Sequence, residues 1–135
     1  MESFSRGRLV MPNHWNMQTL TDVRDKEIFS SDGEKIGSVR DIYYDDATSQ
    51  PEWVGIGTGF LGMQEKLVPV EVLEFQGDAL RVPFTKDKVK EEPDFKLEDG
   101  RLSNADEIAL CRHFGIDGEH NHITRMLKYG DSYVR

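Results

Sequence analysis

Residues 28–44 read IFSSDGEKIGSVRDIYY, and this stretch decides the fold. Two runs of β-prone residues flank Asp32-Gly33, a dipeptide typical of tight hairpin turns because such turns need a positive φ angle. The stretch therefore predicts a β-hairpin whose second strand extends to Tyr44.

Further turn signals follow at short spacing. Polar residues 45–51 form a turn cluster, Gly59 and Gly62 permit a tight loop, and Gly77-Asp78 marks another turn. The strands expected between these turns cover residues 52–57, 65–70, 72–75 and 79–84. Five or six short strands at this spacing predict a mainly β protein, a small antiparallel barrel that leaves few exposed edges.

Helical signals begin after the last predicted strand. The charged stretch 86–93 has room for one or two helical turns before Pro93 stops it. Residues 104–114 predict a C-terminal α-helix, because Ser103 offers an N-cap and Gly115 suits the helix end.

The chain of 135 residues is the size of one domain with one core. We expect an N-terminal arm (1–25), the barrel (26–93), a linker with the helix (94–115) and a flexible tail (116–135). The arm shows no helical or strand period, yet Trp15 would be costly to leave in water. We therefore expect the arm to pack on the barrel of its own chain or of a second copy in a homodimer.

Composition limits the classes of function. The net charge of -8 argues against a general nucleic-acid binder, since nucleic acids attract basic surfaces. No apolar run approaches the roughly 20 residues of a transmembrane helix, and no signal peptide is expected. The lone Cys111 cannot form an internal disulfide, which fits a cytoplasmic protein.

The order of motifs resembles bacterial PRC-barrel proteins over about residues 26–93. The matching segments are DGEKIGSV (32–39), YDDAT (44–48), PEWV (51–54), TG (58–59), VPV (68–70) and VPFTKDKVK (82–90). The family is named for the cytoplasmic domain of the photosynthetic reaction centre H subunit, and a related barrel forms part of a ribosome maturation factor. In both settings the barrel binds a larger assembly. The resemblance therefore implies a non-catalytic docking module, not an enzyme.

Two clusters of polar residues are candidate metal ligands. Asp45, Asp46 and Glu52 carry oxygen ligands, but adjacent aspartates are standard turn formers, and we favour that interpretation. His113, His120 and His122 lie within ten residues, but a structural zinc site needs four closed ligands. We expect solvated histidines, no metal and no cofactor.

Apolar residues outside the predicted core are candidates for an interaction surface. They are Trp15, Phe60, Leu61, Met63 and Phe114. For Phe60 two interpretations remain equal, a docking loop or a plug of the barrel end. We expect a protein-protein adaptor. The alternatives are an RNA-processing or ribosome-associated factor, and a small-molecule or metal-binding regulator.

Overall fold

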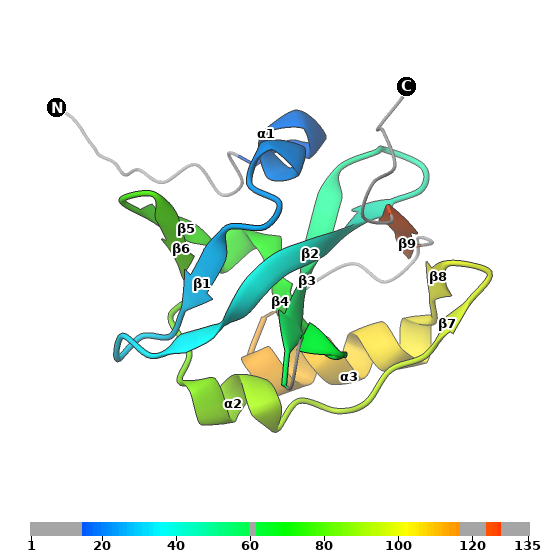
Figure 1. Ribbon diagram of the computed structural model, residues 1–135. Coiled ribbons are helices and arrows are strands. Elements are labelled where there is room, and N and C mark those ends of the chain that lie inside the picture. The colour runs from blue at the N-terminus through cyan, green and yellow to red at the C-terminus, as the bar shows by residue number, and fades with distance from the viewer. Residues whose placement is uncertain (1–14, 60–61, 117–123, 128–135) are drawn as a thin grey trace, which may run out of the picture.

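The computed structural model describes residues 15–59, 62–116 and 124–127 (Figure 1). Within them, nine strands form a single sheet. The strands are β1 Glu27–Phe29, β2 Lys35–Asp45, β3 Pro51–Thr58, β4 Gln64–Pro69, β5 Glu74–Gln76, β6 Ala79–Arg81, β7 Leu97–Glu98, β8 Arg101–Leu102 and β9 Thr124–Leu127. The helices are α1 Met17–Asp22, α2 Lys86–Lys90 and α3 Asn104–Phe114, with a 3₁₀ turn η2 at Val70–Val72.

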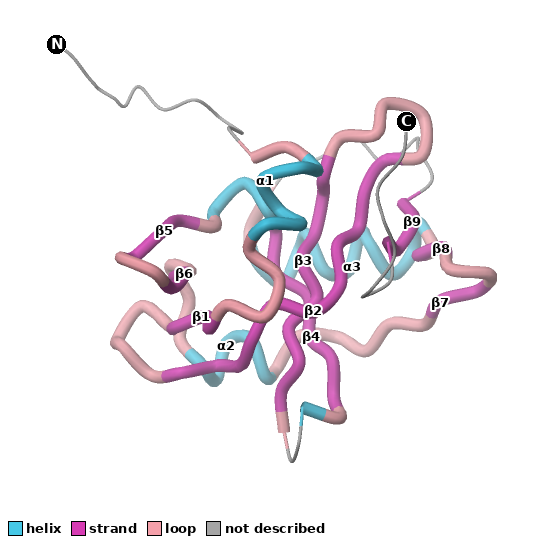
Figure 2. Tube along the Cα trace, turned by 45° about the horizontal axis from the view of Figure 1, so that its top comes forward, coloured by secondary structure: helices cyan, strands magenta, loops and turns pink. Residues whose placement is uncertain are grey.

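The long strand β2 organises the sheet. One edge of β2 pairs with β3 along most of its length, and β3 pairs onward with β4. The other edge pairs with β1 near its start and with β9 near its end. The order β5-β6-β1-β2-β9-β8-β7, with β3 and β4 on the opposite edge of β2, gives the strongly bent sheet visible in Figure 2.

Irregular pairing bends β2. Its register with β3 shifts between Val39 and Asp41, so that Arg40 is an extra residue in the ladder. A β-bulge of this kind increases the local twist and turns a strand. The bulge therefore lets one strand belong to two differently oriented parts of the barrel.

The first hairpin forms as the sequence predicts. Gly33 has a φ of 89° at the turn, and its N–H donates to Ser30 O at 3.1 Å. The strand pair on either side of this turn is antiparallel.

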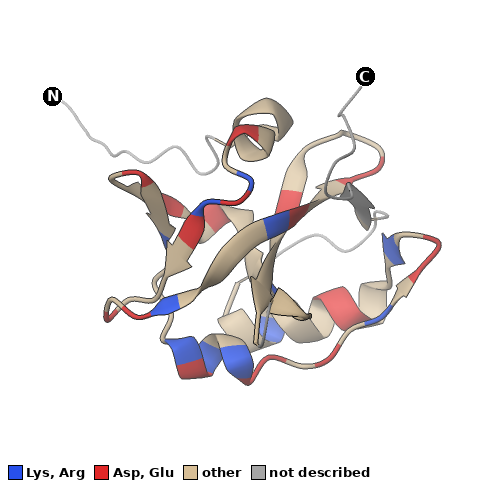
Figure 3. Ribbon diagram, in the orientation of Figure 1, with Lys and Arg blue, Asp and Glu red and all other residues tan. Residues whose placement is uncertain are grey.

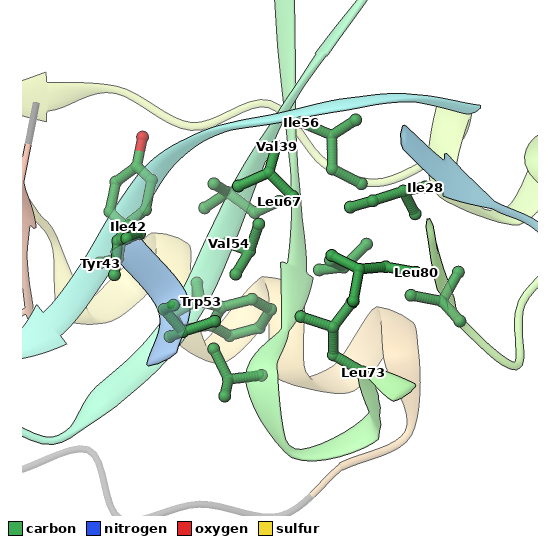
Figure 4. Close-up of a cluster of buried hydrophobic side chains, with 14 of the residues drawn as sticks. Ile28, Val39, Ile42, Tyr43, Trp53, Val54, Ile56, Leu67, Leu73 and Leu80 are labelled. Carbon is green, nitrogen blue, oxygen red and sulfur yellow. The ribbon is translucent and has the colours of Figure 1, made fainter. Parts of the chain in front are cut away.

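Apolar side chains fill the inside of the bent sheet (Figure 4). Ile42 and Val54 are directly opposite each other on β2 and β3, and Val68 continues the row on β4. All three are fully buried. Alternate residues of these strands, Tyr43 and Trp53, point to the other face of the sheet. In Figure 1, α3 lies below the sheet and α1 above it.

The structure confirms a mainly β barrel with a C-terminal helix, and α3 has the bounds 104–114 that the sequence predicts. The prediction of a purely antiparallel sheet was wrong in one place, because β1 and β6 pair in parallel.

The structure adds regular elements to both flanking segments and corrects the expectation of a flexible tail. The arm contains α1, whose capping box joins Asn16 and Thr19, and the predicted flexible tail contains β9, which pairs with β2. The sequence also gave no sign of the short hairpin β7–β8.

Candidate functional site

A groove of about 990 Å³ opens at one end of the barrel. Its walls come from the start of β2, the end of β3, the start of β4 and α2. Two apolar side chains, Ile36 and Val89, are buried beneath it. Volumes of about 300–1,000 Å³ are usual for sites that hold small molecules.

Of the residues that the structure describes, four lysines and no acidic residue line this groove: Lys35, Lys66, Lys86 and Lys90. Lys86 and Lys90 are four residues apart on α2 and therefore share a helix face. Figure 3 shows this concentration of positive charge on α2, with Lys35 at the adjacent start of β2. The groove is therefore a positively charged region of a chain whose net charge is -8.

Only one of the four lysines has an ion pair in the part of the chain that the structure describes. Lys35 Nζ lies 2.9 Å from Glu27 Oε2 at an exposed position. For the described residues no salt bridge forms at Lys66, Lys86 or Lys90. Three lysines around one cavity therefore lack a salt bridge within the described chain, although Lys66 lies near enough to Glu92 to lower its pKa.

A second polar cluster lies on the outer face of the barrel. Gly55 is opposite Asp41 on β2 and Leu67 on β4, and the Glu65 carboxyl occupies the space that a Gly55 side chain would need. Burial, and after it a hydrogen bond to Asp41 and the Asp41 charge, together raise the pKa of Glu65 to about 8. At neutral pH Glu65 is therefore largely protonated and can donate to Asp41.

Tyr43 completes this second cluster. Burial raises the pKa of the Tyr43 phenol, and the nearby Glu65 and Asp41 charges act in the same direction. Its hydroxyl makes no hydrogen bond of normal geometry to the rest of the described chain, although Glu65 is its neighbour. Tyr43 therefore stays neutral, which does not favour it as a nucleophile or base.

Glu92 occupies the free edge of β4. Its Oε1 accepts a hydrogen bond from the Leu67 N–H at 2.7 Å, 25 residues away in the chain. Burial raises the pKa of Glu92 to about 8, while the hydrogen bond from Leu67 and the charge of Lys66 lower it. The Glu92 side chain therefore covers the free edge of β4 at Leu67.

Glu107 joins α3 to two strands. Its Oε2 accepts from the Trp53 indole N–H at 2.9 Å, and its Oε1 accepts from the Thr124 hydroxyl at 3.0 Å. Glu107 is only 2% exposed. This bridge explains why a charged residue in the first turn of α3 points inward.

The predicted interaction residues separate into three groups. Trp15 and Phe114 are buried within the chain, at 5% and 6% exposure, so neither side chain is open to a partner. Trp15 donates its indole N–H to Leu73 O at 2.8 Å, and the arm thus packs on its own barrel. Met63 is 77% exposed. Phe60 and Leu61 lie outside the described residues.

The candidate metal ligands do not assemble where the structure describes them. Asp45 Oδ1 accepts from the Ala47 N–H at 2.8 Å, which is the turn chemistry expected of that residue. His113 Nε2 lies 2.6 Å from Lys88 O. His120 and His122 fall outside the described residues. Within the described ranges no three His, Cys, Asp or Glu side chains are placed to hold a metal.

Sequence reasoning missed the lysine groove and Phe75. The lysines are scattered from position 35 to 90, so only folding brings them together. The sequence placed Phe75 at the end of the predicted strand 72–75 without indicating its exposure, which is 59%. The available signal was the Gly77-Asp78 turn directly after Gln76, because it predicts a short hairpin strand at that point.

A bent sheet with a filled interior, closed at one side by a C-terminal helix, defines a small β-barrel domain. The model of the PRC-barrel domain matches residues 16–89, more than half of the chain, and the chain therefore belongs to the PRC-barrel family. Comparison with curated protein sequences found no match. None of the described helices has both the length and the apolar character needed to cross a membrane.

Proposed function

We propose that this PRC barrel is a non-catalytic protein-binding module that works as an adaptor in the bacterial cytoplasm. The observation that carries the proposal is Phe75, a large aromatic side chain left 59% exposed on the edge strand β5. Solvent-exposed aromatic residues at a sheet edge are typical of contact surfaces. The burial of the lone Cys111 is compatible with a reducing compartment.

Two edge strands of the sheet, β4 and β5, differ in how many free backbone groups they offer to a partner. On β4, the outward N–H of Leu67 is taken by Glu92, and Pro69 has no N–H to offer. On β5, all three residues are exposed. Since a strand can add only to an edge with free backbone groups, β5 is the better docking edge.

The hairpin geometry sets which groups β5 presents. Gly77 and Asp78 form a two-residue turn that Gln76 and Ala79 close. In such a turn the closing residues bond to each other, so the next residue, Phe75, directs its N–H and C=O away from β6. The ring of Phe75 lies 5.1 Å from the buried Trp15 ring, which supports one side of the exposed Phe75 side chain.

The partner that we propose first is a second copy of this chain. A two-fold antiparallel pairing centred on Phe75 would put Glu74 opposite Gln76 of the second copy. That register avoids like charges facing each other and makes both backbone bonds at Phe75. The resulting interface is isologous, the usual form in homodimers.

Phe75→Lys is expected to convert a dimer to a monomer in sedimentation velocity, because a charged side chain on an edge strand opposes strand pairing. Met63→Lys is the matched control, since Met63 is the other large apolar residue exposed in the described part of the chain and lies away from β5. Both variants should keep the circular dichroism spectrum of the barrel. A wild-type monomer at every concentration would contradict self-association through β5.

Pull-down from the native host tests the wider adaptor role. A partner captured by wild type and by Met63→Lys, but lost with Phe75→Lys, would support binding through the same edge. Partners captured equally by all three proteins would contradict it.

A further inference from the structure

We propose that the lysine-lined groove binds a small ligand carrying an oligophosphate group, a function separate from pairing at the β5 edge. The positive charge of the groove supports this proposal. Lys66, Lys86 and Lys90 form no ion pair with the described residues, and none of those residues brings a carboxylate to the groove lining. Mutual repulsion among these lysines is relieved by an anion, and the low-dielectric walls of a cavity concentrate their field.

The lysine ammonium groups are hydrogen-bond donors suited to phosphate. The lining lysines come from three elements, β2, β4 and α2, and therefore belong to different walls of the cavity. Lysine binds phosphate as a mobile point charge with three donors. A ligand with several phosphate charges can engage several lysines at once, whereas a single carboxylate cannot.

The side chains that line the groove favour recognition of phosphate over recognition of a base. Among the described residues, the lining side chains are lysines, small or polar residues and the aliphatic Ile36 and Val89, with no aromatic ring. A nucleobase therefore finds no stacking surface in the described walls. The volume of about 990 Å³ accommodates a nucleotide, but recognition would rest on its phosphates.

The shape and total charge disfavour a long nucleic acid. Phosphate backbones bind to extended basic surfaces, and the chain outside the groove contributes to a net charge of -8. A compact phosphate group enters the groove without meeting that acidic surface.

Isothermal titration with inorganic triphosphate at low ionic strength tests the proposal. We expect saturable binding of about one equivalent, weakening as salt rises because the contacts are ionic. Titration with ATP is a second arm, and a similar affinity is expected since the phosphates carry the recognition. Binding of ATP without binding of triphosphate would overturn the proposal, as would no binding of triphosphate below about 1 mM, a value typical of weak non-specific association.

Charge-matched variants locate the site. The double variant Lys86→Gln and Lys90→Gln should weaken triphosphate binding by roughly tenfold or more, since it removes two charge-assisted donors. The control, Lys88→Gln with Lys96→Gln, changes the net charge equally at positions outside the groove, one of them on the same helix. Equal weakening by both double variants would overturn the groove as the site. Lys66→Gln, on β4, provides an independent variant should α2 be perturbed.

Discussion

Trp53→Ala is expected to lower the free energy of unfolding by about 3–5 kcal/mol, as truncation of a buried aromatic side chain usually does. Trp53 is 2% exposed and its ring lies 6.4 Å from the Phe114 ring on α3. The change would leave a cavity between barrel and helix and remove the donor that Glu107 Oε2 accepts. Urea unfolding followed by circular dichroism measures the loss.

Two variants separate packing from hydrogen bonding at this site. Trp53→Phe keeps an aromatic ring but loses the indole N–H, so we expect a smaller loss of roughly 1–3 kcal/mol from the unpaired acceptor. Phe75→Ala removes an exposed aromatic ring and should cost under about 1 kcal/mol. A loss at Trp53→Ala no larger than at Phe75→Ala would contradict the placement of Trp53 between barrel and helix.

Stability is expected to fall as the pH rises from about 4.5 to about 8. Both Glu65 and Glu92 have a pKa near 8 in the folded chain, against 4.5 as the ordinary value. Between these values the folded state holds protons that the unfolded state has released, so the slope of unfolding free energy with pH is negative. The stabilisation is complete below the unfolded pKa and lost above the folded one.

Neutral variants should remove this pH dependence. Glu65→Gln and Glu92→Gln are each expected to be more stable than wild type at pH 9, by on the order of 1–3 kcal/mol after allowance for solvent screening, with little difference at pH 5. Glutamine at position 92 retains an oxygen that can accept from Leu67. Glu98→Gln, at an exposed position on β7, is the control. A wild-type stability that rises steadily from pH 5 to pH 9 would contradict the buried neutral acids.

Much of the barrel could be predicted from local signals. The turn at Gly33 and the helix from Ser103 to Gly115 depend on conformations and caps that neighbouring residues determine. By contrast, β9 is held in the sheet by pairing with β2, a strand about 80 residues earlier in the chain. Its sequence carries only a weak signal of its own, and residues around it resemble a polar tail.

The candidate sites depended on long-range packing and were therefore harder to predict. Phe114 fits the apolar face of an amphipathic helix, and periodicity identifies that face without revealing whether it meets a barrel or a partner. The groove lysines come from distant segments, so their juxtaposition exists only in the fold. The inward orientation of Glu107 likewise depends on Trp53 and Thr124.

The central claim is that β5 is the docking edge, and amide hydrogen exchange at Phe75 tests it most directly. If two copies pair there, the Phe75 N–H becomes a backbone hydrogen-bond donor, and its exchange should slow as protein concentration rises. Met63→Lys should behave like wild type, while Phe75→Lys should lose the concentration dependence at position 75. Exchange at Phe75 that is equally fast at all concentrations would contradict pairing through this edge.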